Sequence, residues 1–228
     1  MPKVGIVTLL LALELGVYYT LGNFPSFIVQ IIIVGYMFYW YYSKRKPDFN
    51  ASDRLLMIST LISLFSPLTI YITDFFINSA LKFTLIGLNY VLIIVMFRLE
   101  GAKIDFSGKS KTFLVFVSYI FTPFAFLFAV IFPLTSVQNA VLVGVYILPL
   151  TYMVLLSTFL PYSEKSKFYI SISMFSVLLA SGVSAYHLYV SSFPLDYSAL
   201  RILITASRVC MLLGMLNRFN TNEKTFLT

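Results

Sequence analysis

Hydrophobic residues along this chain gather into eight long runs separated by short polar segments. A bilayer core about 30 Å thick is crossed by roughly 20 apolar residues in a helix, and inside it the backbone must hydrogen-bond to itself. The pattern therefore predicts an all-α fold, a polytopic integral membrane bundle of eight transmembrane helices in one domain, residues 1–228. The predicted spans are approximately 4–21, 24–42, 55–72, 78–97, 113–132, 140–160, 168–190 and 198–216.

Composition favours a membrane location and excludes several kinds of site. The chain is 59% hydrophobic and 11% charged, whereas soluble domains carry roughly a quarter charged residues. Cys210 is the only cysteine and His187 the only histidine. An internal disulfide and a metal centre built from several Cys or His ligands are therefore excluded, and we expect no metal and no cofactor.

Basic residues indicate how the spans are oriented. The net charge is +7, and with eight spans thirteen Lys and Arg residues fall on the side of the two termini, against Lys82 and Arg201 on the other. The thirteen are Lys3, Lys44, Arg45, Lys46, Arg54, Arg98, Lys103, Lys109, Lys111, Lys165, Lys167, Arg218 and Lys224. This is the positive-inside pattern, which predicts cytoplasmic termini in a cell (inner) membrane. We interpret the basic excess as orientation and expect no nucleic-acid partner.

Ionisable residues at membrane depth are functional candidates, because an unpaired charge there is costly. Glu14 lies near the middle of the first predicted span and Arg208 near the middle of the last. The simplest interpretation is a Glu14–Arg208 ion pair that joins the first helix to the eighth. Two alternatives stay open: a catalytic or transport role for both charges, or contact of Arg208 with a lipid phosphate or a partner subunit.

Polar residues also gather at the extracytoplasmic ends of the predicted spans. Asp74 ends the third span, His187 lies near the end of the seventh, and Asp196 and Arg201 flank the last connection. We expect these four side chains to line one shallow polar mouth. A solvated or capping role is the alternative for His187.

The seventh predicted span contains a stripe of small residues. These are Ala180, Ser181, Gly182, Ser184 and Ala185. Small side chains let helices approach closely inside a membrane, so this stripe predicts a tight helix–helix contact.

Four segments carry a resemblance to a known family. They are Lys46-Pro47 after the second span, Leu61 to Tyr90 in the third and fourth, Val145 to Met153 in the sixth, and Ser176 to Pro194 in the seventh. Over nearly its whole length the chain resembles the YhhN-type family of lysoplasmalogenase-like membrane proteins. The resemblance implies an eight-helix protein of an inner or endoplasmic-reticulum membrane.

The chain departs from that family at the positions that matter for catalysis. The family carries an aspartate in the third span and another in the seventh, where this chain has Ser66-Pro67 and Ala180-Ser181. Cleavage of a vinyl ether needs protonation of carbon and a guided water, which is work for paired carboxylates. The resemblance therefore assigns no catalytic residue to this chain, and a non-enzymatic role is favoured.

Three functions remain in competition. The leading hypothesis is a non-enzymatic scaffold or lipid-contacting subunit of a membrane complex, with membrane lipids and a membrane protein as partners. The second is a lysoplasmalogenase-like lipid hydrolase that uses Glu14, Asp74 or His187, which requires two of these side chains to converge on a lipid-sized cavity. The third is a small transporter in which Glu14 and Arg208 are the coupling charges.

Overall fold

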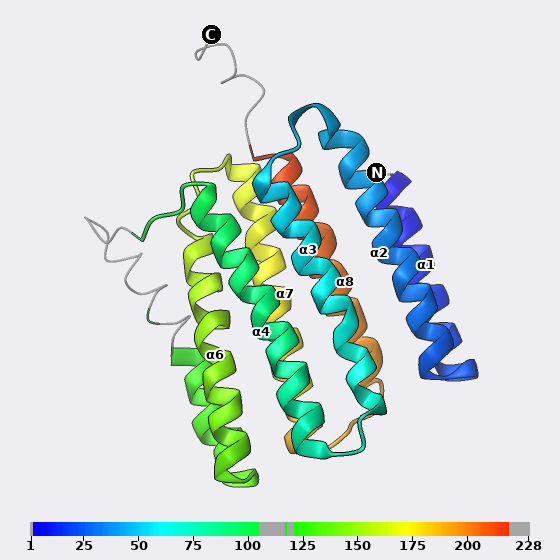
Figure 1. Cartoon of the computed structure of the whole chain (residues 1–228), viewed down its shortest axis with the longest axis vertical. Helices are drawn as coiled ribbons and strands as arrows, with labels where there is room; N and C mark the ends of the chain where they lie inside the picture. The colour runs from blue at the N-terminus through cyan, green and yellow to red at the C-terminus, as the bar shows by residue number, and fades with distance from the viewer. Residues whose placement is uncertain (1, 105–116, 118–120, 219–228) are drawn as a thin grey trace.

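The computed structural model describes residues 2–104, 117 and 121–218, and this part of the chain is helical and contains no strand. The main helices are α1 (Pro2–Leu21), α2 (Asn23–Arg45), α3 (Ala51–Phe65), α4 (Phe75–Leu99), α6 (Val137–Ser157), α7 (Glu164–Tyr189) and α8 (Asp196–Leu216) (Figure 1). Short elements are η1 (Lys46–Asp48), η2 (Ser66–Tyr71), the π-helical η3 (Leu127–Ile131) and η4 (Phe132–Leu134). The predicted all-α fold is confirmed.

Six of these helices, α1, α2, α4, α6, α7 and α8, are long and apolar enough to cross a membrane. The third predicted span is composite, because α3 has 15 residues and continues as the 3₁₀ helix η2. Pro67 lies at the start of η2, where its missing N–H costs no internal helical bond. The fifth predicted span, 113–132, falls partly outside the described residues, and its described part from residue 121 onwards belongs to an apolar helix over Phe121–Leu134.

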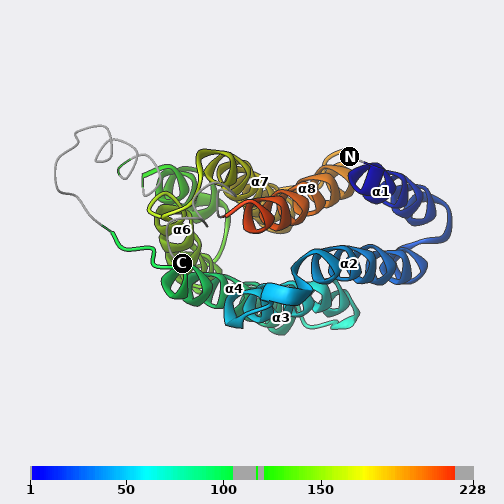
Figure 2. The ribbon, with the colours of Figure 1, turned by 90° about the horizontal axis from the view of Figure 1, so that it is seen from above.

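The helices form two facing rows. Seen from above, α1, α8 and α7 lie in one row, α2, α3 and α4 lie opposite, and α6 closes the side next to α4 and α7 (Figure 2). The α2–α3 and α6–α7 connections, the start of α1 and the end of α8 lie at the same end of the bundle (Figure 1). We call this the basic end (residues 45–51, 99–104, 157–164 and 216–218) and the opposite one the mouth end (residues 21–23, 71–75, 132–137 and 189–196).

Charge is distributed very unequally between these two ends. Of the thirteen cations assigned to one side, ten lie in the described part of the chain at or near the basic end. The described residues of the mouth end include no Lys or Arg. The two cations expected on that outer surface, Lys82 and Arg201, instead lie within α4 and α8 and line an interior cavity.

Helices α7 and α8 are in tight contact near the basic end. A Cβ atom added to Gly214 of α8 would lie 2.5 Å from Cγ1 of Ile170 on α7. The Ser166 hydroxyl donates to the carbonyl oxygen of Gly214 at 2.7 Å, and the hydroxyls of Ser173 and Ser207 lie 3.0 Å apart. Missing Cβ atoms and short polar side chains therefore bring these helices together.

The small-residue stripe on α7 does not make this contact. A Cβ added to Gly182 would meet no atom within 4 Å. Ala180 and Ala185 are buried, whereas Ser181 and Ser184 line the interior cavity. The predicted tight contact is therefore wrong for Gly182, because spacing along one helix does not reveal which face meets a neighbour.

Replacing Gly214 by alanine should destabilise the protein by about 1–3 kcal/mol, because the new methyl group would overlap Ile170 in a packed interface. Gly182→Ala is the matched control, since its surroundings are open and alanine favours a helix over glycine. Thermal unfolding in one detergent would measure both. Equal melting temperatures for the two variants would contradict the assignment of the α7–α8 contact.

Candidate functional site

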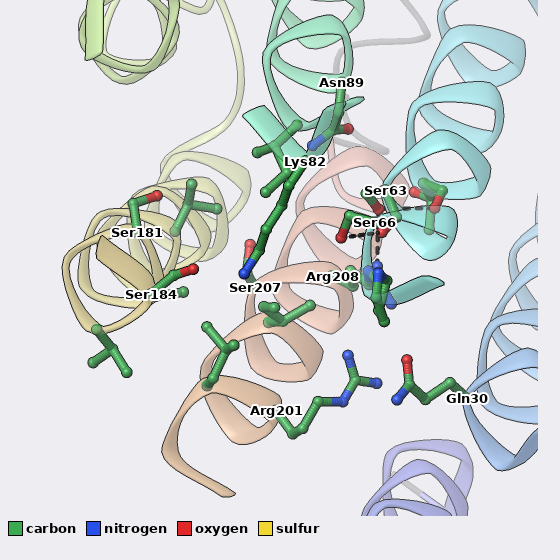
Figure 3. Close-up of a pocket in the computed structure, with 18 of the residues that line it drawn as sticks. Gln30, Ser63, Ser66, Lys82, Asn89, Ser181, Ser184, Arg201, Ser207 and Arg208 are labelled. Carbon is green, nitrogen blue, oxygen red and sulfur yellow. Dashed lines mark hydrogen bonds between the residues drawn. The ribbon is translucent and has the colours of Figure 1, made fainter. Parts of the chain in front are cut away.

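A cavity of about 370 Å³ lies between the two rows of helices. Its walls come from α2, α3, η2, α4, α7 and α8, with single contributions from α1 and α6. Towards the basic end the wall is largely apolar, and it includes Met37, Phe38, Leu56, Ile93, Met211 and Leu212. The middle and the mouth end carry the polar side chains, many of which are drawn in Figure 3.

Two cations face this cavity without a carboxylate partner. Lys82 extends from α4 into the cavity, and Arg208 of α8 lies against α3, where it donates to the Ser63 hydroxyl at 2.8 Å (Figure 3). Within the described part of the chain, no Asp or Glu lies within 4.0 Å of either cation. A charge inside a membrane protein is costly unless it is paired, hydrated or bound to a ligand.

Further donors surround these cations. The side chains of Asn89 and Ser184 line the cavity and form no hydrogen bond with any residue that the structure describes. Ser63 and Ser66 donate their hydroxyl protons to backbone carbonyls of α3, at 2.8 and 3.1 Å, so their oxygens remain as acceptors. The hydrogen-bond donors available to a ligand near the middle of the cavity are thus the Lys82 ammonium, the Arg208 guanidinium, the Asn89 amide and the Ser184 hydroxyl.

A ring of three hydroxyls forms one wall of the cavity. The Tyr90 and Tyr146 hydroxyls lie 2.8 Å apart, and each lies 3.0 Å from the Ser181 hydroxyl. This ring joins α4, α6 and α7 and satisfies three polar groups that are otherwise surrounded by apolar side chains. The Ser181 hydroxyl is therefore already hydrogen-bonded to two tyrosines of the wall.

Glu14 pairs with Arg201 and not with Arg208, which corrects the predicted ion pair. The guanidinium group of Arg201 donates from Nε to Oε1 at 2.6 Å and from Nη2 to Oε2 at 3.1 Å. The side chain of Glu14 is fully buried, and Tyr197 also donates to it at 3.0 Å. Arg208 follows Arg201 by seven residues, about 10 Å along α8, which is too far for the same carboxylate.

The predicted polar mouth forms only in part. Nδ1 of His187 lies 2.5 Å from Oδ2 of Asp196, and both residues line the cavity. Arg201 also reaches the cavity but is committed to Glu14. Asp74 does not line the cavity and instead caps α4 by accepting from the Ile77 backbone N–H at 2.8 Å.

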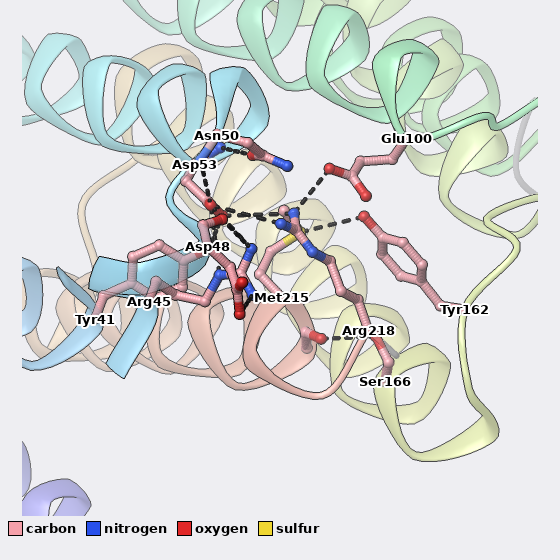
Figure 4. A network of polar contacts seen from close by, with 11 residues as sticks. Tyr41, Arg45, Asp48, Asn50, Asp53, Glu100, Tyr162, Ser166, Met215 and Arg218 are labelled. Carbon is pink, nitrogen blue, oxygen red and sulfur yellow. Dashed lines mark hydrogen bonds and ion pairs between the residues drawn. The ribbon is translucent and has the colours of Figure 1, made fainter. Parts of the chain in front are cut away.

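A buried cluster that the sequence did not reveal ties together the basic end (Figure 4). We call it the clasp, and its members are Tyr41, Arg45, Asp53, Glu100, Tyr162 and Arg218. Asp53 is fully buried, and its carboxylate forms ion pairs with the guanidinium groups of Arg45 at 3.1 Å and Arg218 at 3.4 Å. The Tyr41 hydroxyl also donates a hydrogen bond to this carboxylate. Arg218 also reaches Glu100 at 2.7 Å.

The clasp closes the cavity at the basic end. It joins α2, α3, α8, the end of α4 and the loop before α7, above a layer that includes the fully buried Met96, Phe97 and Met215. Burial, and then the neighbouring Glu100, raise the pKa of Tyr162, so this phenol stays protonated. It donates to Sδ of Met215 at 3.4 Å. The one sequence signal for this cluster was the Asn50–Asp53 capping box at the start of α3.

The chain matches no protein-family model, no curated protein and no solved structure. The resemblance to the YhhN-type family therefore remains an expectation from the sequence. The two positions where that family carries aspartates, Ser66 and Ser181, both line the cavity. Neither side chain is a carboxylate, so these two positions do not supply the paired acids that the resemblance would require.

Substituting Asp53 by asparagine should destabilise the protein by about 3–5 kcal/mol, because two buried guanidinium groups would lose their shared counter-charge. Glu164→Gln is the control, since Glu164 forms an exposed pair with Lys167 that should be worth less than about 1 kcal/mol. Denaturant titration in mixed micelles would measure both. If Asp53→Asn lowered the free energy of unfolding as little as the control does, a structural role for the clasp would be contradicted.

A double-mutant cycle would test the partner of Glu14. Glu14→Gln should destabilise by about 3–5 kcal/mol, since it leaves Arg201 buried without a counter-charge. Adding Arg201→Gln should recover part of that loss, whereas adding Arg208→Gln should not, because coupling is confined to residues in contact. Thermal unfolding of these variants and of the single variants Arg201→Gln and Arg208→Gln would measure the coupling. Recovery with Arg208→Gln and not with Arg201→Gln would favour the pair predicted from the sequence.

Proposed function

We propose that the chain is a non-enzymatic, lipid-contacting protein of the cell (inner) membrane that crosses the bilayer eight times and binds an anionic ligand inside its bundle. The eight crossings comprise the six long helices, the composite α3–η2 segment, and a fifth span that ends in the apolar helix Phe121–Leu134. Cytoplasmic termini are supported by the concentration of Lys and Arg at the basic end.

The observation that carries this proposal is the pair of cations without a carboxylate partner, Lys82 and Arg208, on the wall of the interior cavity. The other interior charges of the described chain meet an opposite charge, namely Glu14 with Arg201 and the members of the clasp. An anion would supply the missing counter-charge and receive hydrogen bonds that are stronger in this environment than in water.

Hydrolysis is less well supported than binding. The hydrolase hypothesis requires two of Glu14, Asp74 and His187 to converge on the cavity, but only His187 lines it. Glu14 is occupied by Arg201, and Asp74 caps α4. The transporter hypothesis is also less well supported, because it requires Glu14 and Arg208 to act as coupled charges. Glu14 pairs with Arg201 instead, and Arg208 bonds to Ser63. A membrane protein partner stays a prediction from the sequence.

Anion binding would be tested by extracting small molecules from protein purified in a mild non-ionic detergent and identifying them by mass spectrometry. The wild type should carry an anionic molecule in near-stoichiometric amount, and Lys82→Gln and Arg208→Gln should each lower its content at least about tenfold, the effect of losing one charged contact. Lys103→Gln, which removes an exposed cation at the basic end, is the matched control. Equal content in all four proteins would refute the proposal.

A further inference from the structure

We infer that the ligand is a phosphate monoester carried on a single hydrocarbon chain, with its head between Lys82 and Arg208 and its chain directed towards the basic end. This inference rests on the proposed function and adds the chemical class and the orientation of the ligand. It follows from three features of the cavity: the number and position of the free cations, the change from polar to apolar lining along its length, and the closure of one end.

The head group would lie between opposite walls of the cavity. Lys82 comes from α4 in one row of helices, and Arg208 comes from α8 in the other (Figures 2 and 3). Lys82 lies seven residues after the first residue of α4, and Arg208 twelve after the first of α8. These spacings correspond to depths of about 10 and 18 Å from the mouth end, so both charges face the outer and middle parts of the cavity.

Two free cations fit a phosphate monoester better than a carboxylate. A monoester carries about −1.5 to −2 charges near pH 7 and offers three acceptor oxygens outside the ester link, whereas a carboxylate neutralises a single cation. Arginine binds phosphate through paired N–H donors, and lysine adds a point charge. The side chains of Asn89 and Ser184, which form no hydrogen bond within the described chain, are further donors in the same cavity.

The inner part of the cavity fits a hydrocarbon chain. Beyond Arg208, the lining towards the basic end includes Met37, Leu56, Ile93 and Met211. Apolar walls of this kind hold water poorly, and methionine adapts to chains of irregular shape. The volume of about 370 Å³ lies near the lower limit of ligand cavities, which favours one chain over two.

The ends of the cavity fix the direction of the ligand. At the mouth end the lining includes Asn23 and Tyr71, which are exposed, and the exposed His187 of the pair with Asp196. At the basic end the clasp and the buried layer beneath it separate the cavity from the surface. An amphiphile therefore places its chain at the sealed end and its head nearer the mouth.

The test compares four probes on the purified full chain in one non-ionic detergent: decyl phosphate, undecanoate, decylphosphocholine and inorganic phosphate. The three amphiphiles carry the same ten-carbon alkyl chain, so they differ in head group. Decyl phosphate should bind at least tenfold more tightly than each of the other probes. Lys82→Gln and Arg208→Gln should each weaken its binding at least tenfold, and Lys103→Gln should leave it unchanged.

A second variant probes the chain-binding part of the cavity. Met211→Trp adds bulk to the apolar wall and should weaken decyl phosphate at least fivefold while leaving inorganic phosphate nearly unchanged. The folding of the variant is checked by its melting temperature. Equal binding of inorganic and decyl phosphate would overturn the amphiphile and leave the anion site standing. Equal binding of undecanoate would overturn the phosphate head, and binding of none of the four probes would overturn the proposed function as well.

Discussion

The cost of placing a charge in a low-dielectric interior governs the arrangement of this bundle. A charged side chain there must be paired, hydrated or bound to a ligand, and removing one partner of a buried pair costs several kcal/mol. Glu14 and Arg201 satisfy this constraint by pairing across two helices, and the clasp satisfies it by sharing Asp53 between two guanidinium groups. In the described part of the chain, Lys82 and Arg208 are the interior charges without an opposite charge, and both lie on the wall of the cavity.

The same constraint explains how α1 is held in place. Most of its surface is exposed in the structure, and its buried side chains are Val7 and Glu14. Apolar burial gives a helix little orientation when its surroundings are lipid, because lipid tails are as apolar as leucine. The bidentate Glu14–Arg201 pair and the stacked rings of Tyr18 and Tyr197, 3.4 Å apart, therefore fix the position of α1 against α8.

Hydrophobic run length predicted the helices well, because crossing a bilayer imposes a minimum length on each. Run length did not identify the partner of Glu14, however. Arg201 and Arg208 lie about two turns apart on the same helix, and the depth of Glu14 estimated from the span boundaries was too imprecise to choose between them. Lys82 was assigned to a surface because it lies near the start of the predicted span 78–97, whereas α4 begins seven residues before it at Phe75. Span boundaries thus limited the accuracy of every predicted charge contact.

The clasp escaped prediction for a different reason. Arg45, Asp53 and Arg218 lie at helix ends, where charges normally indicate orientation and remain solvated. Only the packing of α2, α3 and α8 against one another buries them, and that packing is a long-range property of the fold.

The unequal ends of the bundle favour a binding protein over an open channel. A channel needs a continuous polar path, but the cavity here changes from polar to apolar towards the basic end and stops beneath fully buried side chains and the clasp. Opening that end would require separating Asp53 from two cations in the interior, at a cost comparable to that of breaking a buried ion pair. At the mouth end the chain is irregular, with the 3₁₀ helix η2 and Leu195 at a φ of 66° before α8. The end with weaker helical order is thus the one through which the proposed ligand would reach Lys82 and Arg208.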